Sequence, residues 1–335
     1  MLGVDILVLL AGLIVILAGS ELFTNAIEHV GQRLSLSEGL VGSVFAAVAT
    51  ALPETLVPVV AVFFGGANTA MRGHIGVGAI LGAPLMLVSI AMSLLALFAA
   101  LKRGWTAQLK PESSGFLRDL MYFIVAFTIA LLSLLIPPEL RAARVMASIS
   151  LVFLYVVYVT NTVRASKMLV LDGHGTHSEF ALWIGRIGIA HKLWSEITQL
   201  ALGLALIVAG AKIFVYGVEQ LALLTGLSAL LLSLLIVPVA TEMPEKINSI
   251  LWIRRSKDTL AFSNITGALV FQSTLLTAFG IQLSVWRPQP DILWSMGLTF
   301  AAALWVLLLK VSRRFTPALL VVSAFAYAAL FYLLV

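Results

Sequence analysis

Two copies of the pattern Thr-x-x-Pro-Glu stand 191 residues apart in the chain, at 50–54 and 241–245. Each copy lies in a long apolar segment and ends in a glutamate, Glu54 or Glu245. A carboxylate at the depth of a membrane costs a few kcal/mol, and a bound cation or a proton is the usual compensation. The pattern therefore predicts that each glutamate binds a cation or a proton.

The proline of each copy adds backbone oxygen atoms to this chemistry. A proline inside a helix has no N–H, so the carbonyl four residues earlier, that of Ala49 or Ala240, loses its hydrogen bond. The hydroxyl groups of Thr50 and Thr241 lie next to these carbonyls. Hard oxygen ligands with two formal negative charges suit Ca²⁺ or Na⁺ and do not suit soft metals. In the alternative interpretation, the prolines only bend their helices and the glutamates pair with lysines.

The elements that must position these residues are membrane-spanning helices. Of the 335 residues, 61% are hydrophobic and 11% are charged, whereas about 25% of a typical soluble domain is charged. This composition excludes a soluble or disordered protein, and the absence of cysteine excludes a disulfide scaffold. The apolar runs do not alternate and are too long for barrel strands. Ten such segments are expected, at 5–27, 39–64, 74–100, 119–136, 143–163, 195–221, 227–252, 259–284, 291–309 and 316–335.

An internal repeat divides these segments into two halves. When the chain is shifted by 191 residues, 18–55 aligns with 209–246 without a gap and with twelve identities in 38 positions. Five spans separate the two copies, and because five is odd the copies have opposite orientations in the membrane. We therefore expect an all-α polytopic membrane protein of about ten transmembrane helices in two inverted five-helix repeats. The first repeat is 1–163, a cytoplasmic connecting loop is 164–194, and the second repeat is 195–335.

The distribution of basic residues predicts the orientation. With an external N-terminus, the internal loops hold 15 Lys and Arg residues and the external loops hold 4, in agreement with the positive-inside rule. We expect both termini to be external and the membrane to be a plasma membrane, namely a prokaryotic inner membrane. The same distribution accounts for the net charge of +5 without a nucleic-acid partner. Neither a P-loop nor a dinucleotide fingerprint nor a nucleophile elbow occurs, so the sequence indicates no enzyme and no cofactor.

Two further patterns concern packing. Glycine-rich runs in the first, third and sixth segments indicate close contact between helices. Tryptophans near the ends of segments are expected to anchor the chain at the membrane interface, namely Trp105, Trp252, Trp286 and Trp294.

At the two repeated cores the chain resembles the Ca²⁺/cation antiporter superfamily, in particular its Na⁺/Ca²⁺ exchanger branch. That family carries a G-T-S-L-P-E-like core on the second and seventh of ten helices, and the matches here are A-T-A-L-P-E at 49–54 and A-T-E-M-P-E at 240–245. In the family the two glutamates bind Ca²⁺ and compete for Na⁺, and the threonine carbonyls contribute. The resemblance implies these roles for Glu54, Glu245, Thr50 and Thr241, and an inorganic cation as the transported substrate.

The family completes its site with a G-N-I-x-G-S-N-like stretch on the third and eighth helices. The eighth segment here keeps Ser263 and Asn264, and Gln272 stands at the family's Asn or Asp ligand position. The third segment has Ala79 and Ala83 where polar residues are expected. The resemblance therefore implies ligands from the eighth segment, and the missing ones in the third leave the coupling to Na⁺ open.

Additional charges in the spans distinguish this chain from the family pattern. Glu242 replaces a small hydroxyl residue, and Lys246 follows Glu245. Glu242 and Lys246 are spaced i, i+4 with the acid first, which is the favoured order for a helical ion pair. Either they form an internal ion pair, or Lys246 takes the place of a coupling cation, or Glu242 carries protons. Glu21 and Lys212 occupy equivalent positions in the two repeats, and we expect them to pair or to flank an access pathway.

The sequence thus predicts a secondary-active antiporter that exchanges Ca²⁺ for Na⁺ or H⁺ by alternating access. The alternatives are an exchanger of another cation, one coupled to H⁺ alone, and a non-transporting membrane homologue. A passive channel is disfavoured because the spans hold opposing charges and no filter-like segment. The expected partners are inorganic cations and the lipid bilayer; the sequence names no protein partner.

Overall fold

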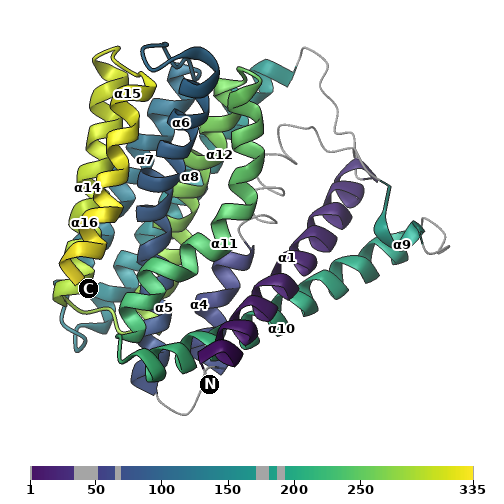
Figure 1. Cartoon of the computed structure of the whole chain (residues 1–335), viewed down its shortest axis with the longest axis vertical. Coiled ribbons are helices and arrows are strands. Elements are labelled where there is room, and N and C mark those ends of the chain that lie inside the picture. Colours follow the sequence, from purple (N-terminus) through teal and green to yellow (C-terminus); the bar gives the residue numbers. More distant parts are fainter. Residues whose placement is uncertain (1, 34–51, 65–68, 171–180, 187–192, 335) are drawn as a thin grey trace. The chain divides into compact units, whose positions relative to one another are not determined.

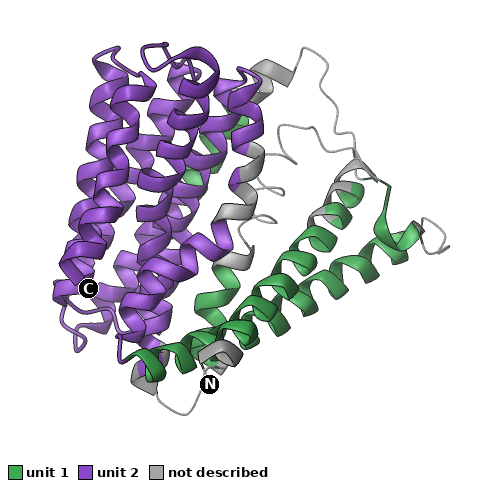
Figure 2. Cartoon of the chain, in the orientation of Figure 1, with its two compact units in different colours: residues 1–67, 156–225 green, residues 68–155, 226–335 purple. Residues whose placement is uncertain are grey.

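The computed structural model of the chain describes residues 2–33, 52–64, 69–170, 181–186 and 193–334. Within these residues every regular element is a helix (Figure 1). The chain divides into two compact units: 1–67 with 156–225, and 68–155 with 226–335 (Figure 2). The chain passes from one unit to the other at three points, one of which lies inside the long helix α8.

The helices have the following bounds in chain order. They are α1 (Leu2–Arg33), α4 (Leu52–Phe64), α5 (Thr69–Met86), η2 (Leu87–Ala91), α6 (Met92–Arg103), α7 (Ser113–Ser133), α8 (Arg141–Val170), α9 (Trp183–Arg186), α10 (Leu193–Thr225), α11 (Ala229–Arg254), α12 (Asp258–Phe271), η3 (Gln272–Leu276), α13 (Thr277–Leu283), α14 (Pro290–Val311), α15 (Pro317–Leu320), η4 (Val321–Ser323) and α16 (Ala324–Leu334).

The helices agree closely with the expected spans. In the part of the chain that the structure describes, eight helices are long and apolar enough to cross a membrane. A shorter apolar stretch, Ala229–Glu242, begins α11 and belongs to the expected seventh span. Of the expected second span only α4 is described, so the Ala49 carbonyl and Thr50 lie outside the described residues. The multi-pass, all-α prediction is confirmed.

In the first unit, α1 and α10 cross with their backbones almost in contact. A Cβ atom on Gly12 would lie only 2.6 Å from the backbone nitrogen of Phe214. A Cβ atom on Gly203 would lie 2.7 Å from the backbone nitrogen of Phe23. Residue numbers rise along one helix as they fall along the other, so the two helices run antiparallel. The glycine-rich runs of the first and sixth segments therefore do mediate close packing, as predicted.

These contacts obey the 191-residue repeat. Gly12 and Gly203 are 191 residues apart, and so are their contacts Phe23 and Phe214. The same holds for a second set, in which Gly19 meets the backbone nitrogen of Ile207 at 2.8 Å and Gly210 meets that of Ile16 at 2.7 Å. Exchanging the two repeats therefore maps the contact onto itself. Such a pattern requires a two-fold relation between α1 and α10, which is the inverted repeat expected from the sequence.

A polar network ties the end of α1 to the start of α10. The Nε and Nη2 atoms of Arg33 donate to the carboxylate of Glu196 at distances from 2.6 to 3.0 Å, and Glu196 is fully buried. The amide nitrogen of Gln199 donates to Oδ1 of Asn25 at 2.8 Å. The backbone nitrogen of Trp183 also donates to this oxygen, at 3.2 Å. The network therefore holds the start of α9 against the helix pair.

In the second unit, α5 packs along α11. A Cβ atom on Gly78 would lie 2.5 Å from Cβ of Ser233, and Gly82 lies against the carbonyl of Leu234 and the ring of Pro238. Pro238 has no N–H to donate to that carbonyl. Gly82 therefore packs against α11 at the point where the helix lacks a backbone hydrogen bond. The glycines of the third segment therefore also serve helix packing.

Both halves carry a π-helical turn at the same relative position. These turns are η2 and η3, whose bounds differ by 185 residues throughout, and the motif positions Ala79 and Asn264 differ by the same number. The hydroxyl of Thr277 donates to the carbonyl of Gln272 at 3.0 Å across the wider turn η3. Single π turns inside α-helices are frequent at functional sites.

The prediction that Trp286 anchors the membrane interface is wrong. Its side chain is fully buried, and its Nε1 donates to the hydroxyl of Ser133 at 2.8 Å. The tryptophan lies in the turn after α13, where packing against α7 was invisible to a pattern of residues near segment ends. Trp105 and Trp294, by contrast, are exposed.

Candidate cation-binding site

Helix α11 places two opposite charges on one of its faces, inside the protein. Glu242 and Lys246 are one helical turn apart, and their side chains are 1% and 2% exposed. The ammonium Nζ of Lys246 lies 3.3 Å from Oε2 of Glu242. The internal ion pair that the i, i+4 spacing predicts is therefore present. A buried pair of this kind is a weak contributor to stability, so its presence in a span calls for a functional reason.

The π turn η3 brings a third polar side chain to this pair. Nε2 of Gln272, which is 1% exposed, donates to Oε1 of Glu242. Its own carbonyl oxygen, Oε1, accepts no hydrogen bond within the described residues. Buried amide oxygens in proteins usually accept a hydrogen bond or bind an ion. Gln272 therefore joins Glu242 and Lys246 in one buried cluster, which we call the Glu–Lys–Gln cluster.

The other predicted ligands of the second repeat are distributed around this cluster. Thr241 is buried, and its hydroxyl donates to the carbonyl of Val237 at 3.0 Å. Nδ2 of Asn264 donates to the hydroxyl of Ser249 at 2.8 Å, so helices α11 and α12 are linked at this point. Ser263 is exposed on α12, and Ala240 is half-buried on α11. The structure therefore brings Glu242 and Gln272 together and leaves Ser263 apart from them.

The two principal glutamates lie on described helices, although their side chains are outside the described part. Glu54 is the third residue of α4, and Glu245 lies in α11 between Glu242 and Lys246. Glu245 follows Glu242 by three residues along this helix. The hydroxyl of Thr50 belongs to the undescribed segment before α4.

The equivalent charges Glu21 and Lys212 are not part of the cluster. Both side chains are exposed, on α1 and α10 respectively. The antiparallel crossing pairs Gly19 with Ile207 and Gly12 with Phe214, so Glu21 lies nearer the level of Ile207 than that of Lys212. The register therefore does not place the two charges opposite each other.

The sequence analysis did not identify the buried carboxylate of Asp119. Asp119 on α7 is 4% exposed, and its Oδ2 accepts a hydrogen bond of 2.8 Å from the hydroxyl of Thr266 on α12. Asp119 stands at the start of an expected span, where charged residues usually face water, so its position gave no signal. The contact joins the fourth and eighth spans two residues from Asn264.

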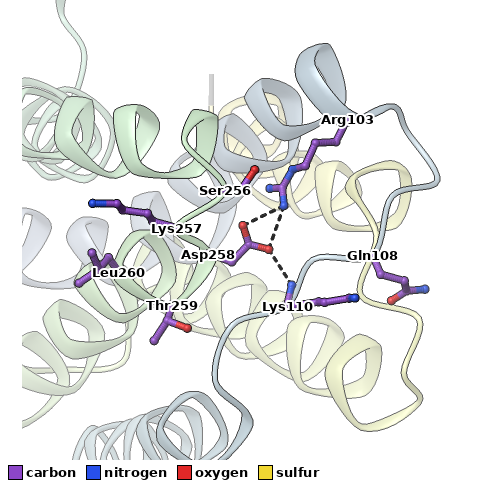
Figure 3. A pocket seen from close by; sticks show the side chains of 8 residues that line it. All are labelled: Arg103, Gln108, Lys110, Ser256, Lys257, Asp258, Thr259 and Leu260. Atoms are coloured by element: carbon purple, nitrogen blue, oxygen red, sulfur yellow. Dashed lines mark hydrogen bonds and ion pairs between the residues drawn. The ribbon is translucent and has the colours of Figure 1, made fainter. Parts of the chain in front are cut away.

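A cavity of about 330 Å³ lies at the helix ends of the second unit, away from the cluster (Figure 3). Asp258 at the start of α12 pairs with Nη1 of Arg103 at 2.9 Å and accepts from the backbone nitrogen of Lys110 at 2.7 Å. These bonds fasten the turn after α6 to α12. Glu242 is twelve residues from the end of α11, which is roughly 18 Å of helix at 1.5 Å per residue. This cavity therefore belongs to the clamp between loops and not to the intramembrane chemistry.

Comparisons with known proteins agree with this architecture. The family described as sodium/calcium exchanger protein matches residues 4–164 and 195–335. The protein named "Putative antiporter CaxA" from Alkalimonas amylolytica is 25% identical over 275 residues, which are 81% of this chain and 78% of that protein. The crystal structure of an H⁺/Ca²⁺ exchanger, CAX, superposes with a TM-score of 0.71 at 19% identity, covering 98% of this chain and 80% of that one. The sodium–calcium exchanger NCX_Mj superposes with a TM-score of 0.60 at 17% identity, covering 99% of both chains. The chain therefore belongs to the sodium/calcium exchanger family of membrane transporters.

Proposed function

We propose that the protein is a secondary-active antiporter that exchanges Ca²⁺ for Na⁺ or H⁺ across the membrane by alternating access. Glu54 and Glu245, one from each repeat, bind the transported cation, with oxygen atoms of Thr50, Thr241, Ala49 and Ala240 as further ligands. One ion excludes the other from these glutamates, and this competition couples the two fluxes.

The observation that carries the proposal is the duplicated Thr-x-x-Pro-Glu core in an inverted repeat. The backbone contacts of α1 and α10 repeat with the same 191-residue interval that relates the two cores. Sites formed by inverted repeats near the bilayer midplane are the common design of secondary transporters. A glutamate in each copy supplies the negative charge that a divalent cation requires.

The composition of the ligands favours Ca²⁺ as the exchanged ion and leaves two candidates for the coupling ion. Two structures with the same fold are named for H⁺/Ca²⁺ and sodium–calcium exchange. In this chain Ala79 and Ala83 are buried and apolar at positions equivalent to Asn264 and Ala268, so the third span adds no polar side chain there. The second repeat adds Asn264 and Gln272 as side-chain ligands.

The membrane orientation completes the proposal. The excess of Lys and Arg in alternate loops favours external termini and a cytoplasmic loop at 164–194, between repeats at 1–163 and 195–335. On this basis the protein acts in the plasma membrane, and the basic ends around Arg103 and Lys257 face the cytoplasm.

Uptake of radioactive Ca²⁺ into proteoliposomes tests the proposal and identifies the coupling ion. The wild-type protein is assayed with an outward Na⁺ gradient, with an outward H⁺ gradient, and with neither. We expect uptake above that of protein-free liposomes under one of the two gradients and no net accumulation without a gradient. If the protein is incorporated into the liposomes but transports no Ca²⁺ under either gradient, the result would contradict Ca²⁺ exchange. That result would favour transport of another cation or a non-transporting homologue in which Lys246 excludes the ion.

A further inference from the structure

The Glu–Lys–Gln cluster carries a cation that is part of the chain itself. Nζ of Lys246 lies 3.3 Å from a carboxylate oxygen of Glu242, and both side chains are buried by protein and not by lipid. An ammonium is a compact group with a single positive charge. It can therefore take the place of a dehydrated monovalent metal ion among oxygen atoms. Its partner Glu242 precedes Glu245 by three residues in α11.

The side chains that form the cluster with Lys246 carry oxygen atoms of the kind that bind a monovalent cation. Glu242 offers two carboxylate oxygens, of which Oε1 also accepts from Gln272. The Oε1 atom of Gln272 accepts nothing within the described residues, although it is buried. Carboxylate and amide oxygens are hard ligands that suit Na⁺ or K⁺ and do not suit soft metals. Without the lysine, the cluster would hold an unpaired buried carboxylate and a free amide oxygen.

The two repeats differ at these positions in a concerted way. The residues equivalent to Glu242, Lys246 and Gln272 in the first repeat are Ala51, Thr55 and Leu87, with the last taken from the 185-residue register of the π turns. The first repeat therefore has neither the anion nor the cation. The second repeat has both, one helical turn apart, so its additional negative charge is accompanied by a positive charge.

We propose that the ammonium of Lys246 is a tethered monovalent cation that occupies the position of a monovalent metal ion beside Glu242 and Gln272. The lysine thereby keeps free Na⁺ or K⁺ from binding at this position. The inference deepens the proposed function, because it assumes that the second repeat holds part of a cation site. Its consequence is that removing the ammonium alone creates a binding site for a monovalent cation.

Thermal unfolding of the purified protein in different salts tests this consequence without any transport. The wild type and Lys246→Met are melted in Na⁺, in K⁺ and in N-methyl-D-glucamine chloride of equal ionic strength. A ligand that binds only the folded state raises the melting temperature in proportion to the logarithm of its concentration above the dissociation constant. We expect Lys246→Met to show a saturable rise with Na⁺ or K⁺ that exceeds any rise of the wild type, because Na⁺ bound at the proposed two-glutamate site would stabilise both proteins.

Three further variants isolate the cause. Lys246→Arg keeps the charge and should respond to Na⁺ as the wild type does. Glu242→Gln combined with Lys246→Met removes the anion as well and should lose the additional response of Lys246→Met. Lys257→Met removes an exposed lysine at the N-cap of α12 and should respond as the wild type does.

Each outcome decides the inference. If Lys246→Met aggregates in N-methyl-D-glucamine but is restored by Na⁺ or K⁺, the tethered cation is supported. If Lys246→Met aggregates in all salts while the double variant is stable, no monovalent ion replaces the ammonium and the inference is overturned. Equal salt responses of wild type and Lys246→Met also overturn it. Because Ca²⁺ uptake by the wild type reports separately on the proposed function, the two can fail independently.

Discussion

The crossing of α1 and α10 makes a quantitative prediction about four glycines. Replacing any of Gly12, Gly19, Gly203 and Gly210 by alanine adds one methyl group at the closest approach of the two backbones. The added Cβ would lie 2.6 to 2.8 Å from a backbone nitrogen of the opposite helix, whereas ordinary van der Waals contact begins at 3.4 Å. The shortfall is 0.6 to 0.8 Å, and a backbone atom cannot rotate away as a flexible side chain can.

The magnitude follows from two opposing effects. Overpacking of this kind costs about 1–3 kcal/mol. Alanine also favours a helix over glycine by about 1 kcal/mol. Gly297 on α14 separates the effects, since a Cβ there meets nothing within 4 Å. We therefore expect each of the four variants to be about 1–3 kcal/mol less stable than Gly297→Ala.

Thermal unfolding in detergent, followed by tryptophan fluorescence, measures this difference. The repeat adds a stricter requirement. Gly12→Ala and Gly203→Ala add a methyl group at equivalent contacts, so both should lower the melting temperature by similar amounts. Gly19→Ala and Gly210→Ala form the second such pair. The reasoning is refuted if the four variants have the same melting temperature as Gly297→Ala. It is also refuted if substitutions of equivalent glycines change the melting temperature by widely different amounts.

Three further substitutions test individual contacts. Thr266→Val removes the 2.8 Å hydrogen bond to the buried carboxylate of Asp119, and the lower melting temperature should correspond to about 1–3 kcal/mol. Arg33→Ala removes the guanidinium from the fully buried Glu196, and adding Glu196→Gln in a double-mutant cycle should recover part of the lost stability. Glu112→Ala removes the N-cap of α7 and should cost about 1 kcal/mol at pH 7. Partial burial opposes ionisation of Glu112, but hydrogen bonds from the backbone of α7 outweigh it and lower its pKa, so the difference from wild type should vanish in acid.

The sign of the pH effect follows from the lowered pKa. Stability from Glu112 is fully present above the carboxyl's unfolded pKa of about 4.3 and is lost as the pH falls through the lower folded value. A difference that persists in acid would contradict the capping role. For Thr266 the matched control is Thr198→Val, where the exposed hydroxyl bonds only its own helix at 2.8 Å and little change is expected. The prediction for Arg33 is contradicted if the variant that combines Arg33→Ala with Glu196→Gln is no more stable than Arg33→Ala alone.

Much of the fold was predictable because a membrane leaves few choices. A hydrophobic stretch of about 20 residues must satisfy its backbone hydrogen bonds internally, so length and composition alone indicate helices and their ends. The inverted repeat was visible because the cores at Glu54 and Glu245 align without a gap. The i, i+4 spacing of Glu242 and Lys246 likewise predicted an ion pair, and the structure contains it.

Other features depend on packing that the pattern does not encode. The π turns η2 and η3 begin at an apolar Leu87 and a polar Gln272, and a hydroxyl residue at an equivalent position in each, Ser89 or Thr274, is too common in helices to indicate them. The burial of Trp286 and of Asp119 depends on which helix covers each side chain. Such information lies in contacts between distant segments, and a single sequence without aligned relatives does not contain it.

The proposed role of two glutamates from opposite repeats is tested most directly by Ca²⁺ uptake into proteoliposomes, under the gradient that drives the wild type. Glu54→Gln and Glu245→Gln each remove one charge from the proposed site while keeping the size of the side chain. Glu139→Gln is the matched control, because this carboxylate lies exposed in the turn between α7 and α8. We predict that uptake falls to the level of protein-free liposomes in both site variants and stays at the wild-type rate in Glu139→Gln. Wild-type uptake by either Glu54→Gln or Glu245→Gln would contradict the two-glutamate site.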